Sequence, residues 1–134
     1  MMNTVNVTAS SKSYPVYIGE DLLDRAGQLA ADVIDPCKAA VITDGNVDRL
    51  YSDRLNSSLK KAGFDTVRFV FPAGEMSKRT DTLVSILNFL AQNKLSPTDA
   101  VFALGGGVTG DLAGFAASVY LRGVRLIQVP TSLL

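Results

Sequence analysis

DAVFALGGGVTGDLAGFAASVYLRGVRLIQVPT, residues 99–131, is the stretch of this chain that decides its fold. It begins with a short apolar run at 100–104, which has the length and composition of a buried strand. Three glycines follow, then a helix-like segment at 108–121, and finally a second apolar run at 124–129. Strand, glycine turn, helix and strand in this order predict a parallel βαβ unit.

The glycine turn is also a candidate anion site. A turn that leads into a helix N-terminus presents unpaired backbone N–H groups and the positive end of the helix dipole. Because Gly105, Gly106 and Gly107 carry no Cβ, an anion such as a phosphate can approach those groups closely. The alternative is a tight turn with close helix–sheet packing. The spacing is neither G-x-G-x-x-G nor a P-loop, since no Lys-Ser or Lys-Thr follows the glycines.

The rest of the chain extends the same alternation. Alternating apolar residues predict two strands, at 4–9 and 14–18, joined as an antiparallel hairpin. Amphipathic helices are predicted at 20–33, at 47–59 and at 80–92, with apolar strands at 38–43 and 66–71 between them. The expected fold class is α/β: a Rossmann-like, mostly parallel sheet flanked by helices, with an N-terminal β-hairpin. Ligands of such sheets bind at the carboxyl ends of the strands.

The composition of the chain excludes several classes of function. The chain has 134 residues, 47% of them hydrophobic and 19% charged, which suits one globular domain. Lys plus Arg and Asp plus Glu both number 13, so no charge excess indicates a nucleic acid or an acidic membrane as partner. No apolar run reaches the roughly 18 residues of a membrane span. The first residues lack a basic region followed by an apolar core, so we do not expect them to be a signal peptide. With a single cysteine, Cys37, no internal disulfide can form, and we expect a cytoplasmic protein. The lack of histidine excludes imidazole catalysis.

The string GGGVTGDLAGFAASVYLRGVRLIQVPTSLL, residues 105–134, resembles the signature of the 3-dehydroquinate synthases. The resemblance implies an enzyme of the shikimate pathway, which makes chorismate for aromatic amino-acid biosynthesis. This lyase converts 3-deoxy-D-arabino-heptulosonate 7-phosphate to 3-dehydroquinate plus phosphate, with bound NAD as a transient oxidant and zinc as a Lewis acid. It also implies that residues 1–134 are the NAD-binding N-terminal domain. The zinc ligands and catalytic lysines would belong to a helical C-terminal domain absent from this chain, so we expect no catalytic residue, no metal site and no activity here.

The same resemblance assigns the site residues. Those implied to bind the cofactor are Asp44, Asn46, Gly74, Glu75, Lys78, Gly106, Gly107, Val108, Thr109, Gly110, Asp111, Thr131 and Ser132. Several have simpler explanations. Asp44 or Asn46 can cap the helix that follows them, and loop 72–79 can be a solvated connection in which Ser77 caps the next helix. Asp111 can simply interact favourably with the helix dipole, because it lies in the first or second turn of the helix. If it contacts a nucleotide instead, its carboxylate should accept a hydrogen bond from a ribose hydroxyl, since it would repel the pyrophosphate.

The resemblance associates Arg122 with the phosphate of the substrate, although a cation at a helix C-terminus needs no ligand. At Thr131-Ser132 the chain departs from the family's more usual double threonine, but serine retains the hydroxyl. The expected partners are NAD and a sugar phosphate, with a homodimer as the assembly. Alternatives are another sugar-phosphate cyclase, an iron-type alcohol or glycerol dehydrogenase, or a non-catalytic nucleotide-binding module. The continuation at 109–115 fits the dehydrogenases poorly.

Overall fold

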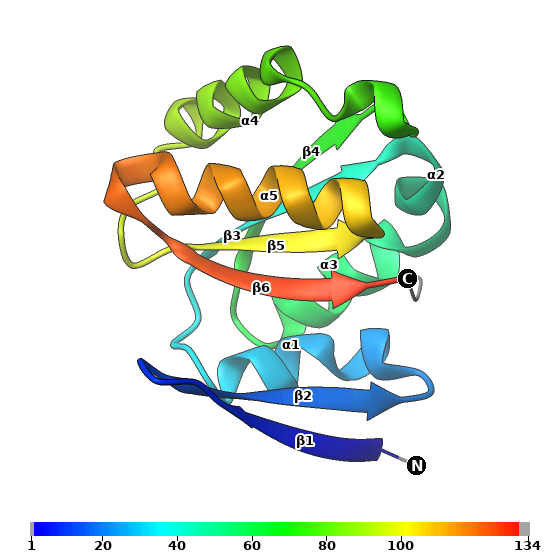
Figure 1. Cartoon of the computed structure of the whole chain (residues 1–134). Coiled ribbons are helices and arrows are strands. Elements are labelled where there is room, and N and C mark those ends of the chain that lie inside the picture. Colours follow the sequence, from blue (N-terminus) through cyan, green and yellow to red (C-terminus); the bar gives the residue numbers. More distant parts are fainter. Residues whose placement is uncertain (1, 132–134) are drawn as a thin grey trace.

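Helices and strands alternate along the chain in the computed structural model, which describes residues 2–131 (Figure 1). In chain order the elements are β1 (Met2–Thr8), β2 (Ser13–Gly19), η1 (Leu22–Arg25), α1 (Ala26–Ala31), β3 (Lys38–Asp44), α2 (Gly45–Val47), η2 (Asp48–Ser52), α3 (Asp53–Lys61), β4 (Asp65–Phe71), η3 (Glu75–Ser77), α4 (Thr80–Gln92), β5 (Ala100–Gly105), α5 (Gly107–Val119), η4 (Tyr120–Arg122) and β6 (Arg125–Pro130).

Strands β3 to β6 form a parallel sheet in the order β4-β3-β5-β6. Helices α4 and α5 cover one face, and α1 and α3 cover the other (Figure 1). All six residues of β5 are buried, as are the five central residues of β3, because both strands are packed between two helical layers. The predicted fold class and the βαβ unit are therefore confirmed.

The strand order places a topological switch between β3 and β5. After β3 the chain adds β4 on one side, and it then returns to pair β5 with the other side of β3. The loops that follow two such strands run in opposite directions across the sheet, which leaves a crevice at their carboxyl ends. Asp44 ends β3 and Gly105 ends β5, so both lie at this edge.

The predicted hairpin is present as a separate two-stranded antiparallel sheet, β1-β2, which lies beyond α1 in Figure 1. The alternation of apolar and polar residues predicted these strands, but it does not give the hairpin a well-buried face. Val5 pairs with Val16, and these side chains are 49% and 37% exposed. A two-stranded sheet has few partners of its own, so its apolar residues stay accessible among the described residues.

Two predicted helices are shorter than their patterns. The segment at 20–33 becomes the 3-10 turn η1 followed by α1, which ends at Ala31, and Val33 is 51% exposed. The helix predicted at 108–121 ends at Val119, because Leu121 and Arg122 turn into the left-handed region with φ of 48° and 65°. Apolar spacing alone does not reveal where the backbone reverses.

Candidate functional site

The carboxyl edge of the sheet gathers most of the predicted site. Asp44 follows β3, loop 72–79 follows β4, and the glycine turn follows β5. The end of β6 joins them, since the backbone N–H of Thr131 donates to the carbonyl of Gly105 at 3.2 Å. Ser132 lies outside the described residues. Parallel strands thus bring four segments that are distant in sequence to one edge.

The glycine turn opens directly into α5. Gly105 has a φ of 153°, and a Cβ at this position would stand 2.6 Å from Oγ1 of Thr109. Gly106 is the N-cap residue, with a φ of −86° and no side-chain cap, and Gly107 is the first helical residue. The N–H groups of the first helical turn therefore have no intrahelical acceptor and no capping side chain. Of the three glycines in the turn, Gly105 alone has a positive φ and so needs the conformational freedom of glycine.

Thr109 was expected at the cofactor, but its side chain lies beneath the turn. The residue is 1% exposed, and Oγ1 has no hydrogen-bond partner among the described residues. A ligand at the turn can therefore meet the backbone N–H of Thr109 but not its hydroxyl. Val108 and Gly110 are partly exposed on either side of it.

Asp44 caps the helix that follows it, as the simpler explanation predicts. Its Oδ1 accepts the N–H groups of Asn46 and Val47, both at 2.9 Å. Both bonds end on the same oxygen, so Oδ2 keeps its lone pairs for a further donor such as a hydroxyl. Asn46 is exposed and its side-chain oxygen accepts from Arg49 at 2.6 Å.

Loop 72–79 is ordered by a buried serine rather than by a helix cap. The hydroxyl of Ser77 donates to the carbonyl of Pro72, and Ser77 is 7% exposed. The N-cap of α4 is instead Arg79, which makes no side-chain cap, so the expectation that Ser77 caps this helix is wrong. Gly74 takes a φ of 115° at the exposed bend of the loop, and Glu75 is exposed beside it.

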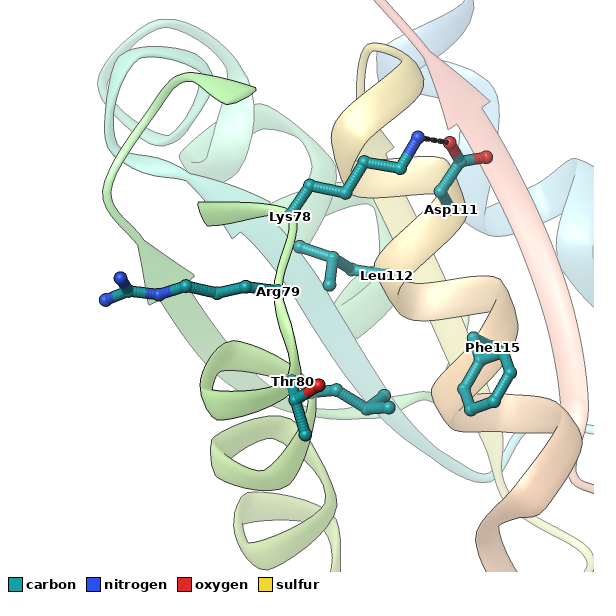
Figure 2. A pocket seen from close by; sticks show the side chains of 7 residues that line it. Lys78, Arg79, Thr80, Asp111, Leu112 and Phe115 are labelled. Carbon is teal, nitrogen blue, oxygen red and sulfur yellow. Dashed lines mark ion pairs between the residues drawn. The ribbon is translucent and has the colours of Figure 1, made fainter. Parts of the chain in front are cut away.

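An ion pair that the sequence reading did not predict joins this loop to α5. Nζ of Lys78 lies 2.7 Å from Oδ2 of Asp111 (Figure 2). The hydrogen bond that Lys78 donates to Asp111, together with the charge of that carboxylate, raises the pKa of Lys78. Both side chains are about half exposed, so the pair contributes little to stability and can be exchanged for a ligand. The ion pair could have been anticipated, because Lys78 and Asp111 carry opposite charges on two segments that were predicted to share one edge of the sheet.

The ion pair borders an open pocket of about 290 Å³ between α4 and α5. Leu83, Leu112 and Phe115 give it an apolar lining. The charged pair Lys78 and Asp111 lies to one side of Leu112 (Figure 2). Arg79 lines the rim, but its guanidinium points away from the pocket.

Arg122 does not lie at the carboxyl edge of the sheet with these residues. It lies past the C-terminal end of α5, whereas the glycine turn lies at the N-terminal end. Thirteen helical residues separate the two ends, and at 1.5 Å per residue this amounts to about 20 Å. Within one chain Arg122 and the glycine turn therefore do not form one site.

Residues 2–131 contain no group of three or more His, Cys, Asp or Glu side chains placed to hold a metal ion. In the same range, none of the helices combines the length and apolar character of a membrane span.

The chain matches proteins of known kind along nearly its whole length. It is 44% identical over 133 residues to a 3-dehydroquinate synthase of Streptococcus suis and 47% identical over 130 residues to one of Rhizobium rhizogenes. These alignments cover 99% and 97% of the chain, but only 37% and 34% of the relatives. The chain thus spans little more than a third of their length.

Solved structures agree with the fold. A 2-deoxy-scyllo-inosose synthase complexed with carbaglucose-6-phosphate, NAD+ and Co2+ superposes with a TM-score of 0.85 at 25% identity, over 96% of this chain and 35% of that one. A 2-epi-5-epi-valiolone synthase from Streptomyces hygroscopicus with NAD+ and Zn2+ gives 0.76 at 28%, over 94% and 34%. A glycerol dehydrogenase of Schizosaccharomyces pombe, at 0.66 and 21% over 82% and 26%, shares the fold.

The parallel sheet, the switch point and the uncapped glycine turn define the class: a Rossmann-like α/β domain with its ligand edge at the carboxyl ends of the strands. Within that class, residues 68–134, which are half of the chain, match the family 3-dehydroquinate synthase N-terminal. The chain belongs to this family.

Proposed function

We propose that this chain is the NAD-binding half of a 3-dehydroquinate synthase, which converts 3-deoxy-D-arabino-heptulosonate 7-phosphate to 3-dehydroquinate plus phosphate. The observation that carries the proposal is the N-terminus of α5. It has no side-chain cap, follows a glycine in positive φ and lies at the switch point of the sheet. A diphosphate there would accept the N–H groups of the first helical turn and complement the helix dipole.

The neighbouring side chains suit the rest of a dinucleotide. We assign Oδ2 of Asp44 and the carboxylate of Asp111 to ribose hydroxyls, because carboxylates accept from hydroxyls but repel phosphates. Lys78 is exposed beside Asp111, at the pocket between α4 and α5, and supplies a positive charge. Further contacts are assigned to Asn46, Gly74, Glu75, Thr131 and Ser132, and to the backbone of Gly106 to Gly110.

When bound, NAD supplies reversible hydride removal from a carbon that bears a hydroxyl group. This chain's residues bind the cofactor and fix its orientation at the strand edge. The described residues do not fit a zinc site, so no step through a metal is assigned to them. We place the metal, the catalytic residues and the lyase chemistry of the shikimate pathway in the remaining length of the relatives.

Arg122 is assigned to the phosphate of the sugar substrate. Because it lies about 20 Å from the glycine turn along α5, it can serve a site there only in a second copy of the chain. We therefore propose a homodimer. A cytoplasmic location completes the proposal, in keeping with the biosynthetic relatives.

Among the sugar-phosphate cyclases, sequence identity favours this substrate. The chain is 44% identical to a 3-dehydroquinate synthase but 25% identical to the 2-deoxy-scyllo-inosose synthase of similar fold.

The proposal is tested by adding a single methyl group at the glycine turn, with the variant Gly107→Ala. Gly107 is helical and not in positive φ, so Gly107→Ala should fold as well as the wild type. Its Cβ would obstruct the approach of a diphosphate to the helix N-terminus. We expect millimolar NAD to raise the melting temperature of the wild-type chain and to leave that of the variant unchanged.

Gly114→Ala is the matched control, because it adds the same methyl group to the same helix two turns away. Its Cβ would meet Leu126 at 3.6 Å, an ordinary contact. This variant should keep the full NAD-dependent rise. An equal rise in all three proteins would remove the glycine turn from the NAD site, and no rise in the wild type would contradict NAD binding by this chain.

A further inference from the structure

Arg49 has no role in the proposed function, although its guanidinium lies at the ligand edge of the sheet. Nη2 of Arg49 donates to Oδ1 of Asn46 at 2.6 Å. A Cβ at Gly45 would stand 4.0 Å from Nη1 of Arg49, so the guanidinium lies over this glycine. Gly45 directly follows Asp44, the last residue of β3. Arg49 therefore lies beside two residues that are assigned to the cofactor.

The stability of the helix does not explain this position. Asn46 and Arg49 are three residues apart in the first turns of the helical segment that begins at Gly45, and a pair at this spacing stabilises a helix only slightly. A cation near a helix N-terminus also opposes the helix dipole. Among the described residues, no carboxylate lies within ion-pair distance of Arg49. A role at the ligand edge accounts for the contact better than a role in folding.

The hydrogen bond from Arg49 decides which way the amide of Asn46 points. A guanidinium only donates hydrogen bonds, so the amide presents its oxygen to Arg49. Nδ2 of Asn46 then faces away from Arg49 and keeps its two donors for a ligand. Asn46 is exposed, so a ligand can reach these donors. Without Arg49 the amide is free to present either its oxygen or its nitrogen.

Asp44 supplies the complementary group two residues earlier. Its Oδ1 accepts the N–H groups of Asn46 and Val47, which fixes the carboxylate and leaves Oδ2 as an acceptor. A fixed acceptor and an oriented donor match two neighbouring hydroxyl groups, of which one donates to Asp44 and the other accepts from Asn46. The cis-diol of a ribose has this chemistry. Because β3 adjoins β5 and its glycine turn, the acid at its end corresponds to the position that contacts the adenosine ribose in Rossmann-type sheets.

We propose that Arg49 is a positioning residue for the cofactor: it holds the Asn46 amide with its nitrogen toward the ligand, so that Asp44 and Asn46 together bind the cis-diol of the adenosine ribose. Arg49 itself need not touch the cofactor, because it acts through Asn46. The inference rests on the NAD site of the proposed function and adds to it a residue that the family resemblance did not assign.

A double-mutant cycle tests whether Arg49 acts through Asn46. Arg49→Met removes the donor at similar side-chain length, and NMR titration of the chain with NAD measures the Kd. This variant should raise the Kd about fivefold, the loss expected for part of one hydrogen bond. In an Asn46→Ala background the same exchange should leave the Kd unchanged, because the positioned amide is gone. Arg49→Lys retains a donor and should restore most of the affinity.

The matched control is Lys60→Met, which removes an equally exposed cation near the far end of the same helical segment and should leave the Kd unchanged. If Arg49 acted only through its charge on the cofactor phosphates, Arg49→Met would cost the same in both backgrounds. That result would overturn this inference while the NAD site stands. No binding of NAD to the wild type would overturn both.

The diol is tested with adenosine monophosphate and its 2′-deoxy analogue, which lacks one hydroxyl. The wild-type chain should bind the ribonucleotide more tightly, and Arg49→Met should reduce this preference. Equal affinity of the wild type for the two nucleotides would contradict diol binding.

The mobility of the Asn46 amide gives a readout that needs no ligand. ¹⁵N relaxation of its side-chain NH₂ group should show a more rigid amide in the wild type than in Arg49→Met. Equal mobility in the two proteins would contradict the positioning role, whatever the outcome of the titrations.

Discussion

The carboxylate of Asp99 accepts the backbone N–H of Lys38 at 3.0 Å and that of Ser96 at 2.8 Å. It thereby ties the start of β3 to the turn that precedes β5, at the edge of the sheet opposite the candidate site. Burial by itself would raise the pKa of this carboxyl, but the two backbone hydrogen bonds, a hydrogen bond from the Ser96 side chain and the charge of Lys38 together hold the pKa below its ordinary value of 3.8.

At the residue scale we predict a pH-dependent loss of stability in Asp99→Ala. A carboxyl whose pKa is lower in the folded state stabilises the fold above its unfolded pKa, and this contribution disappears as the pH falls through the folded pKa. The variant should lose about 1–3 kcal/mol at pH 7 and clearly less at about pH 3. Urea unfolding at both pH values measures the difference. Asp65→Ala, which removes an exposed carboxylate from the same edge, should change little. A pH-independent loss in Asp99→Ala would contradict this account.

Helices α1 and α3 cross at a point where only glycine fits. The N–H of Gly27 donates to Oγ of Ser58 at 2.9 Å, and that hydroxyl donates to the carbonyl of Asp24 at 3.1 Å. A Cβ on Gly27 would stand 2.0 Å from the carbonyl oxygen of Ser58. The obstacle is backbone, so the helices themselves would have to move apart.

At the element scale we therefore predict that Gly27→Ala destabilises the fold by about 2–3 kcal/mol, although alanine is the better helix former. Chemical denaturation measures this loss. Gly114→Ala adds the same methyl group in α5 at an ordinary contact distance and should be neutral or slightly stabilising. Similar stabilities for the two variants would show that the crossing adjusts at little cost.

The whole molecule consists of a well-buried sheet and a lightly attached hairpin. Val41, Ile42, Val101 and Leu104 of the central strands are fully buried, whereas Val5 of β1 is 49% exposed. Strands β1 and β2 pair only with each other among the described residues. Regions with few buried contacts open at a lower free-energy cost than the core of a sheet.

At this scale we predict two classes of amide hydrogen exchange. Amides of β3 and β5 should exchange only through global unfolding, and those of β1 and β2 through local opening that is faster and less sensitive to denaturant. Native-state exchange followed by NMR distinguishes the classes. Equal protection in β1 and β5 would mean that the hairpin and the sheet unfold as one unit.

The sequence by itself determined the elements and the class. Apolar runs, helical spacing and the three glycines after a strand are local signals, and they predicted the parallel sheet, the hairpin and α4 at Thr80–Gln92. They also predicted that Asp44, loop 72–79 and the glycine turn share one edge, because that follows from parallel strands alone. The signature at 105–134 identified the family, which the match over residues 68–134 confirms.

Tertiary structure alone decided which predicted residues meet. The burial of Thr109 beneath Gly105, the pairing of Lys78 with Asp111 and the glycine-only crossing at Gly27 depend on packing between segments far apart in sequence. The position of Arg122 has the same origin, since only the course of α5 across the sheet carries it away from the turn. The periodicity of a segment specifies which face is apolar, but the neighbour that this face meets is set by the order of the strands and the direction of the helices.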